Sequence, residues 1–331
     1  MPSRDLVSWT SLIDGCVKNG LPEDALEIFR RMQVERIDSD YVTVIGVAAA
    51  CGDLGALGHG IWLHRFALSR GLHANVRVGN SLIDMYSRCG RVDFARQVFY
   101  EMPSRTLVTW NSMIVGFAAN GCSEEALIHF SALQRSEIRP DGVSFTGALT
   151  ACSHAGMVGE GLRLYKLMQR EYRIPARVEH YGCVVDLLGR AGLLEEAMRL
   201  VEEMPVKPNE VVLGSLMAAC REHGDVGMAE RLMGFLLEVR PETDSNYVLL
   251  SNIYAAMGRW EGVGKVRSLM KDLGVKKKPG CSAVEVGCSV HEFVAGDGGH
   301  PQTEEIYSLL GLLHLDMELH GYEPVEAIGQ S

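Results

Sequence analysis

Small polar side chains recur at two phase-matched positions of the chain, and they are its clearest candidates for recognition chemistry. The first set is Thr10, Asn80 and Asn111, and the second set is Asp40, Thr106 and Asp141. A hydroxyl or an amide offers both a donor and an acceptor, whereas an ionised aspartate only accepts. Such a file of groups can exchange hydrogen bonds with the polar edges of a bound ligand.

Taken one at a time, these residues have a simpler structural interpretation. A polar residue beside a turn is most often a helix cap, and an aspartate before an extended connection is often only a turn residue. Any single pair is therefore weak evidence for binding. Recurrence at constant positions of a repeated unit is what favours a functional surface.

An internal repeat explains the spacing of these residues. The segment 107–141 aligns with the segment 6–40 without a gap, and fifteen of the 35 positions are identical. The shared residues include Trp9 with Trp110 and Phe29 with Phe130. A repeat of this length indicates a solenoid, in which each unit packs only on its neighbours.

A glycine recurs at the fifteenth position of each unit, and these glycines define the register of the repeats. These glycines are Gly20, Gly55, Gly90, Gly121, Gly156, Gly192, Gly224 and Gly258. The units then begin at residues 6, 41, 76, 107, 142, 178, 210 and 244. A short turn between antiparallel helices favours a positive φ and hence glycine, so each unit is expected to contain two helices.

The apolar pattern within a unit predicts a helical hairpin. One face of the first helix would consist of Trp9, Leu12, Ile13, Cys16 and Val17. Pro22 suits the first turn of the second helix. The predicted fold is therefore all-α: a right-handed superhelical solenoid of helix-turn-helix repeats, whose first helices line the concave surface.

Composition narrows the possible functions. The formal charge of -10 is a poor match to a protein that holds nucleic acid by bulk phosphate neutralisation, although it leaves binding through base edges open. The longest apolar run, from Val42 to Cys51, is too short to cross a bilayer, so no membrane contact is expected. We interpret the nine cysteines as reduced thiols, because several of them fill one apolar position of the repeat.

Specific phrases resemble the plant pentatricopeptide repeat (PPR) family, in the subclass that alternates standard, long and short motifs. They are WNSMIVGFAANG, NSLIDMYSRCGRVDFARQVFYEMP and HYGCVVDLLGRAGLLEEA. The resemblance implies six PPR motifs within 6–209, at 6–40, 41–75, 76–106, 107–141, 142–177 and 178–209. Residues 1–5 match the end of the third unit, which suggests the remnant of a preceding repeat and an N-terminal truncation, with the transit peptide absent.

The C-terminal part resembles the E and E+ motifs of the family's plastid RNA-editing factors. Two E motifs are expected within 210–277, followed by an E+-like tail at 278–331. In the tail, alternating apolar residues on both sides of Gly287-Cys288 predict a β-hairpin. Pro301 is expected to begin a final helix that ends near Gly321. The run Lys276-Lys277-Lys278 could touch phosphate but is more simply a solvated charge run.

The resemblance implies that each repeat recognises about one base, through the fifth and last residues of the unit. On that basis Thr10 with Asp40 selects guanine, Asn111 with Asp141 selects uracil, and Asn80 with Thr106 selects a pyrimidine. Val7 and Val108, second in their units, would hold bases between repeats. Thr146 and Asn209 belong to units that fit the pairing poorly, and those units are expected to contribute spacing, phosphate contacts or protein contacts.

No catalytic residue, metal ligand or cofactor is expected. A nucleobase deaminase needs H-x-E and a later C-x-x-C, and the sequence has neither. Cys281 and Cys288 have weak metal spacing. The histidines at 154, 180, 223 and 300 are interpreted as motif or surface residues. The chain is therefore expected to recruit a catalytic partner.

The functional hypothesis is a sequence-specific single-stranded RNA-binding protein that selects a site for C-to-U editing of organellar transcripts. The implied partners are the RNA, a DYW-type deaminase in trans and the multiple organellar RNA editing factors. A chloroplast location is expected, with the mitochondrion as the alternative. The competing hypotheses are a protein-interaction scaffold without an RNA ligand, an organellar RNA stability or splicing factor, and a truncated product without function.

Overall fold

The computed structural model describes residues 5–239, 245–275, 279–286 and 289–321. The chain divides into two compact units, one at 1–278 and the other at 279–331, which are taken separately below. The expected repeat remnant at the N-terminus, the triple-lysine run and the turn at Gly287-Cys288 lie wholly or mostly outside the described residues.

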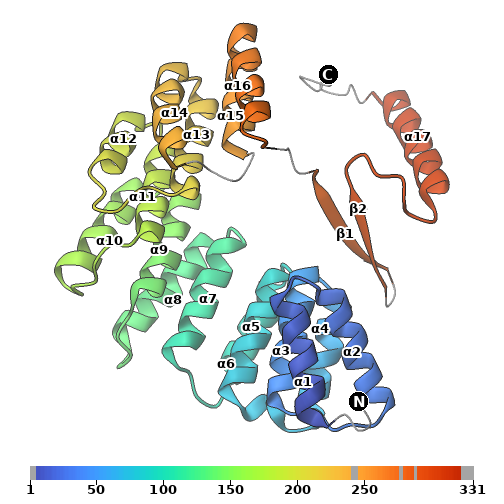
Figure 1. Ribbon diagram of the computed structural model, residues 1–331. Helices are drawn as coiled ribbons and strands as arrows, with labels where there is room; N and C mark the ends of the chain where they lie inside the picture. Colours follow the sequence, from blue (N-terminus) through green and yellow to red (C-terminus); the bar gives the residue numbers. More distant parts are fainter. Residues whose placement is uncertain (1–4, 240–244, 276–278, 287–288, 322–331) are drawn as a thin grey trace. The chain divides into compact units, whose positions relative to one another are not determined.

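The first unit consists of helical hairpins that follow one another along the chain (Figure 1). The four N-terminal hairpins are α1 (Leu6–Lys18) with α2 (Pro22–Val34), α3 (Tyr41–Leu54) with α4 (Leu57–Ser69), α5 (Val76–Arg88) with α6 (Val92–Glu101), and α7 (Leu107–Ala119) with α8 (Ser123–Arg135). The next four are α9 (Gly142–His154) with α10 (Val158–Arg170), α11 (Val178–Arg190) with α12 (Leu194–Glu202), α13 (Glu210–His223) with α14 (Val226–Val239), and α15 (Ser245–Ala256) with α16 (Trp260–Asp272). A 3₁₀ turn, Leu72–Ala74, precedes α5.

The predicted glycine turn is present in every hairpin. All eight glycines have φ between 64° and 75°, which is the left-handed region that other residues avoid. In each turn the residue after the glycine donates its backbone N–H to the carbonyl of the eleventh residue of the unit, as in Leu21 to Cys16 at 2.9 Å. This six-to-one bond of a Schellman motif satisfies a carbonyl that the helix end leaves unpaired.

The hairpins stack through their first helices, which are the odd-numbered ones. In order, α1 packs on α3, α3 on α5, α5 on α7, and so on to α15. Each even-numbered helix packs on its own partner, and those from α2 to α14 also pack on the first helix of the next hairpin. The first helices thus form the continuous row of the stack.

Glycines allow neighbouring first helices to approach closely. A Cβ at Gly116 of α7 would overlap with the Ser87 hydroxyl oxygen of α5. A Cβ at Gly147 of α9 would lie 2.9 Å from Ile114 Cγ2 and 3.3 Å from the Val115 backbone nitrogen. Contacts this short leave no room for a methyl group, so these glycines set the distance between hairpins.

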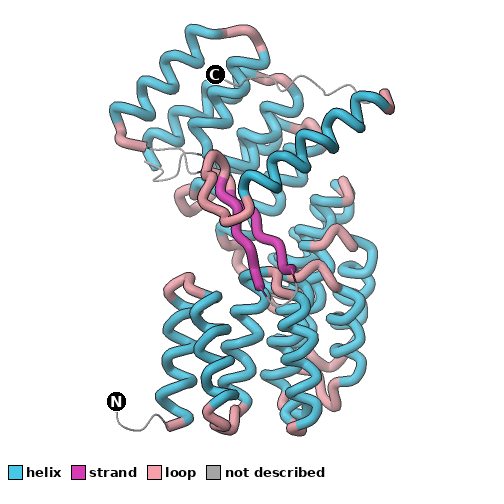
Figure 2. Tube along the Cα trace, turned by 90° about the vertical axis from the view of Figure 1, so that its right-hand side faces the viewer, coloured by secondary structure: helices cyan, strands magenta, loops and turns pink. Residues whose placement is uncertain are grey.

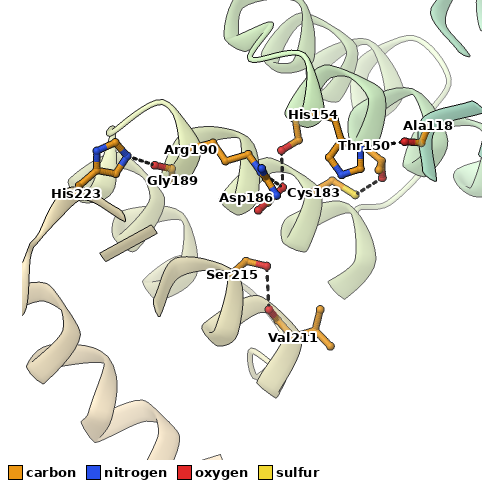
Figure 3. Close-up of polar contacts among 11 residues, drawn as sticks. Ala118, Thr150, His154, Cys183, Asp186, Gly189, Arg190, Val211, Ser215 and His223 are labelled. Carbon is orange, nitrogen blue, oxygen red and sulfur yellow. Dashed lines mark hydrogen bonds and ion pairs between the residues drawn. The ribbon is translucent and has the colours of Figure 1, made fainter. Parts of the chain in front are cut away.

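Side chains near the ends of the first helices also bond to the preceding hairpin. Asn120 Nδ2 donates to the Ser87 carbonyl at 2.9 Å. Figure 3 shows two histidine versions of this contact, from His154 Nδ1 to the Ala118 carbonyl at 2.9 Å and from His223 Nε2 to the Gly189 carbonyl at 3.0 Å. These carbonyls belong to the last turn of a helix, where no intrahelical donor is available. Both histidines are exposed, as expected of surface residues, and in addition they join consecutive hairpins.

The interior of the stack is apolar and contains neutral thiols. Trp9 and Ile13 are buried as expected, whereas Leu12 is 46% exposed and lies off the buried face. The eight cysteines within the described residues are free. Burial raises the pKa of Cys152 to about 11 and that of Cys220 to about 12, so both remain protonated at neutral pH.

The second unit contains the predicted β-hairpin and final helix. Strand β1 (Cys281–Val286) pairs antiparallel with β2 (Ser289–Val294), and Figure 2 shows the two strands side by side. Helix α17 (Thr303–Leu319) begins two residues later than expected from Pro301. The reason is a turn that precedes it, in which the Thr303 hydroxyl donates to the His300 carbonyl at 2.6 Å.

The predicted all-α solenoid of helix-turn-helix repeats, followed by a small β-hairpin and a helix, is confirmed. The first helices begin at the expected unit starts wherever that residue is described; the expected start of α15, residue 244, lies outside the described residues. The division into six repeats, two E motifs and a tail remains a proposal. Among the described helices, none has the length and apolar character needed to span a bilayer.

The close approach at Gly116 predicts that adding one methyl group there lowers the stability of the fold. Gly116→Ala should lower the free energy of unfolding by about 1–3 kcal/mol, because the added Cβ overpacks against Ser87. Gly15 occupies the same position of the first repeat but has no atom within 4 Å of a built Cβ. Gly15→Ala should therefore stabilise its helix by about 0.5–1 kcal/mol. Urea unfolding of both variants would check this pair, and equal effects would contradict it.

Candidate nucleic-acid interface

The last residue of a repeat unit is the N-cap of the next first helix. The Asp40 carboxylate accepts from the Thr43 backbone N–H at 2.8 Å, and the Asp141 carboxylate accepts from the Ser144 backbone N–H at 3.0 Å. Asn209 accepts from the Val212 N–H in the same way, at 3.0 Å. The capping interpretation of these residues is thus correct, and it does not exclude a second role.

The caps Asp40 and Asp141, and also Thr106, which is the N-cap of α7, lie beside the polar fifth residue of the preceding hairpin. A hydroxyl from the third residue of the following unit joins the two in each case. We call these groups the Thr10 cluster (Thr10, Asp40, Thr43), the Asn80 cluster (Asn80, Thr106, Thr109) and the Asn111 cluster (Asn111, Asp141, Ser144). Each cluster is built from two consecutive hairpins, so stacking brings its members together.

In the Thr10 cluster, two hydroxyls and a carboxylate form a chain. The Thr43 hydroxyl donates to Asp40 Oδ1 at 2.9 Å. The hydroxyl oxygens of Thr10 and Thr43 lie 2.9 Å apart. Thr43 is fully buried, whereas Thr10 and Asp40 are partly exposed. A ligand can therefore reach the two outer members but not the bridging hydroxyl.

In the Asn80 cluster, hydroxyls take the place of the carboxylate. The Thr109 hydroxyl donates to Asn80 Oδ1 at 2.7 Å and lies 3.2 Å from the Thr106 hydroxyl. The Thr106 backbone N–H donates to Thr109 Oγ1 at 3.0 Å, which completes a capping box. Thr109 is fully buried, and Asn80 is half-buried.

The Asn111 cluster is the most enclosed of the three. Asn111 Nδ2 donates to Asp141 Oδ1 at 3.0 Å, and the Ser144 hydroxyl donates to Asn111 Oδ1 at 2.6 Å. Burial acts to raise the pKa of Asp141, but bonds from the Ser144 N–H, the Asn111 amide and the Ser144 hydroxyl lower it below its usual value. The carboxylate is therefore ionised at neutral pH. Asn111 itself is only 8% exposed, so any ligand contact must be made at its edge.

The bridging hydroxyls of Thr43, Thr109 and Ser144 are not among the residues predicted from the sequence. All three are fully buried, so they are absent from any surface that a ligand could touch. Their position in the repeat could have identified them in the sequence, because each is the third residue of its unit. Where the third residue is Val78 instead, the preceding fifth residue is the apolar Ile45. Where it is Val212, the preceding fifth residue is Gly182, which has no side chain.

Two of the predicted contact residues lie outside such clusters. Thr146 donates its hydroxyl to the Gly142 carbonyl of its own helix at 3.0 Å. The buried His180, third in the next unit, lies 2.9 Å from the same carbonyl and does not bond to Thr146. Asn209 caps α13, but the matching fifth residue is Gly182, which has no side chain. The structure therefore joins six of the predicted residues in three pairs and leaves Thr146 and Asn209 apart.

Exposed valines accompany the clusters at the second position of the units. Val7 is 70% exposed and Val108 is 59% exposed. They lie three residues before Thr10 and Asn111, which is the spacing of neighbours on one helical face. Val143, at the same position of the next unit, is also exposed. The surface thus alternates apolar side chains with partly accessible polar groups, a combination suited to flat rings with polar edges.

The described residues contain no group of three or more His, Cys, Asp or Glu side chains placed to hold a metal ion. The accessible chemistry of this face consists of neutral amides and hydroxyls, two carboxylates and valines. Such groups can bind a polar, planar ligand.

Comparison with known proteins agrees with the repeat architecture. The PPR repeat model matches residues 7–37, 80–107, 108–138, 143–172 and 179–207, and the E motif model matches residues 223–285. The segment 41–75 is not among the matched ranges, although it forms a hairpin of the same construction.

Relatives from Arabidopsis thaliana extend the similarity along the chain. A chloroplastic pentatricopeptide repeat-containing protein is 55% identical over 88% of this chain and 59% of its own length. A second pentatricopeptide repeat-containing protein is 42% identical over 97% of this chain and 55% of its own length. The chain thus spans little more than half the length of these curated relatives.

A solved structure supports the fold. The crystal structure of a pentatricopeptide repeat protein from maize is 19% identical, with a TM-score of 0.50, over 98% of this chain and 46% of the maize chain. The matched repeats, the E motif and the stacked hairpins together show that this chain belongs to the pentatricopeptide repeat family.

Proposed function

We propose that this chain binds single-stranded RNA sequence-specifically and selects a cytidine for C-to-U editing in an organellar transcript. The observation that carries the proposal is the set of three polar clusters, each assembled from two consecutive hairpins. Along the RNA from 5′ to 3′, the six repeats would meet G, an unselected base, a pyrimidine, U and two unselected bases. A short gap would separate these bases from the edited C.

The charge of the chain supports selection through base edges. A net charge of -10 opposes a binding energy dominated by phosphate neutralisation. Several cations on the first helices are already paired within the protein, as in Arg88 with Asp53 and Arg190 with Asp186. Stacking on the exposed valines and hydrogen bonds at the clusters are then the main sources of affinity.

The editing part of the proposal rests on the E motif and on the second unit. The E motif match runs from residue 223 into strand β1. Helix α17 has no buried residue and exposes Leu309, Leu312 and Leu315. An apolar helix of this kind favours contact with another protein. We assign the partner as a deaminase of the DYW type supplied in trans, with the multiple organellar RNA editing factors as further partners.

The named location of a relative supports a chloroplast site of action, since the relative with 55% identity is chloroplastic. Another relative is chloroplastic or mitochondrial, which keeps the mitochondrion as the alternative. A protein-interaction scaffold without RNA is the alternative function, and the exposed leucines of α17 are the observation that favours it. An RNA stability or splicing factor would use the same RNA surface, and the E motif favours editing over it.

Editing itself is tested in the plant. Deep sequencing of organellar transcripts from a line that lacks the gene should show the loss of at least one C-to-U event, with the proposed bases upstream of the unedited C. The wild-type line and a complemented line serve as controls. If all editing sites keep their wild-type levels, the editing proposal is wrong.

Changing one fifth residue should change one base preference. The wild-type chain should bind an RNA with G at the first position at least about fivefold more tightly than the same RNA with U there. In Thr10→Asn the first unit acquires the pair found at Asn111 and Asp141, so the preference should reverse to U. Gel-shift titrations measure both. A base change opposite Ile45, the apolar fifth residue of the second unit, is the control and should change neither affinity.

The second-position valines should contribute to affinity without selecting bases. Val108→Glu should weaken binding to every RNA in the series by a similar factor of about tenfold, because it removes a stacking surface and adds negative charge near phosphate. Val34→Glu alters a valine on α2, a second helix, that is 72% exposed against 59% for Val108, and should leave binding unchanged. Fluorescence anisotropy would measure both variants, and equal effects would place the RNA elsewhere.

A further inference from the structure

The buried third-position hydroxyls stand between the two residues that the proposed function assigns to each base. Thr43, Thr109 and Ser144 have no exposed surface, so none of them can touch RNA. We propose that they are positioning residues, which together with the capping residue hold the fifth residue of the preceding hairpin so that it offers a donor or an acceptor to the base. This inference rests on the proposed RNA function.

The proton count in the Thr10 cluster fixes the role of Thr10. An ionised carboxylate only accepts, so the 2.9 Å contact with Asp40 requires the Thr43 hydroxyl to donate its single proton there. The Thr43 oxygen must then accept from Thr10 across their 2.9 Å contact. The Thr10 proton is thereby used inside the protein, and its remaining lone pair is what the hydroxyl can offer outward. Together with the second Asp40 oxygen, this hairpin presents acceptors.

The same count gives the opposite result in the Asn111 cluster. Asp141 Oδ1 requires a donor from Asn111, which places Nδ2 toward the carboxylate and Oδ1 toward Ser144. The Ser144 oxygen accepts from the Asp141 backbone N–H at 3.2 Å, and its one proton is shared between Asn111 Oδ1 at 2.6 Å and Asp141 Oδ1 at 3.0 Å. The amide oxygen is thus engaged inside, and the second N–H of Nδ2 remains for a ligand. This hairpin presents a donor beside the free oxygen of a carboxylate.

The Asn80 cluster has no carboxylate to fix its direction. Thr109 contacts Asn80 Oδ1 and the Thr106 hydroxyl, and both hydroxyls can donate or accept. Rotating the Asn80 amide by a half turn would reverse the chain of bonds without leaving a group unpaired. The Asn80 amide can therefore present either its donor or its acceptor outward, in contrast to the fifth residues of the other two clusters.

These polarities match the bases assigned to the three hairpins. Guanine carries two neighbouring N–H donors on its Watson–Crick edge, which suit the acceptors of the Thr10 cluster. Uracil pairs a carbonyl with an N–H, which suits the donor and the carboxylate oxygen of the Asn111 cluster. Cytosine and uracil have a donor and an acceptor exchanged at two neighbouring positions of this edge, and an adjustable Asn80 amide accommodates both.

Repeat boundaries without a bridging hydroxyl provide an internal comparison. Val78 and Val212 occupy the third position after Ile45 and Gly182, which have no group to orient. Valine at this position is fully compatible with the stack, because Val78 is completely buried and Val212 nearly so. The bridging hydroxyl is thus dispensable for folding at a repeat boundary. Each of the three occurs with a polar fifth residue, whereas the polar Thr146 is followed by His180 instead.

The test is Thr43→Val in the full-length chain, assayed with RNAs that differ only at the first base. The backbone N–H at position 43 still donates to Asp40, so the helix cap remains. Thr10 loses its internal acceptor and can turn its proton outward, so the preference for G over U should fall at least about fivefold. Preferences at the third and fourth bases should not change. Thr43→Ser keeps the hydroxyl and should restore the preference for G.

A matched pair on helix α9 provides the second measurement. Ser144→Ala should weaken the preference for U at the fourth base. Ser153→Ala removes another buried hydroxyl of the same helix, which donates to Asp186 at 2.6 Å and lies in no cluster. Ser153→Ala should lower the unfolding midpoint without changing any base preference.

The outcomes distinguish a failure of the positioning role from a failure of the proposed RNA recognition. If wild type prefers G at the first base and Thr43→Val keeps that preference, the positioning role is wrong and RNA recognition stands. A loss of affinity that is equal for all RNAs would also overturn it, since that is the effect of a structural residue. If wild type shows no preference at any base, the proposed function fails, and this inference fails with it.

Discussion

The arrangement of the polar face depends on one constraint: the residue that ends a repeat must cap the first helix of the next. The first backbone N–H groups of a helix have no intrahelical partner, and a capping side chain is worth about 1 kcal/mol. Asp40 and Asp141 are therefore held at a fixed place by folding itself. Because hairpins stack in register, that place lies next to the fifth residue of the preceding hairpin, and stability and recognition share the same atoms.

The stack keeps these atoms from rearranging. Glycines such as Gly116 bring first helices into close contact, and side chains such as Asn120 and His154 bond to carbonyls in the last turn of the preceding first helix. The bridging hydroxyls lie inside this contact, without access to water. A buried hydroxyl that lost its partner would forfeit about 1–3 kcal/mol, so its bonding direction is enforced by the surroundings. Rigid support of this kind is what small differences between base edges require.

Much of the fold followed from the sequence, whereas the contacts between repeats did not. The period of glycines predicted the hairpins because a left-handed turn residue is a local requirement, and all eight glycines meet it. Thr10 and Asp40 could be singled out by phase, but their connection through Thr43 could not, since it depends on how two hairpins stack. The bonds that His154 and His223 make could not be predicted for the same reason: their carbonyl partners lie more than thirty residues earlier.

Electrostatics distinguishes the clusters in a way that composition cannot. The lowered pKa of Asp141 keeps its carboxylate ionised through the neutral range, so a proton never converts it into a donor. The direction of the Asn111 amide is therefore constant wherever the fold is intact. The Asp141 carboxylate also stabilises the fold. The bonds that lower its pKa stabilise the folded chain at pH values above the unfolded pKa, and this stabilisation is lost as the pH falls through the folded pKa. The Asn80 cluster has only hydroxyls at the corresponding place, and its polarity is left for the ligand to choose. A single exchange of aspartate for threonine at the end of a repeat thus converts a fixed pattern of donors and acceptors into an adaptable one, with no change in the hairpins that carry it.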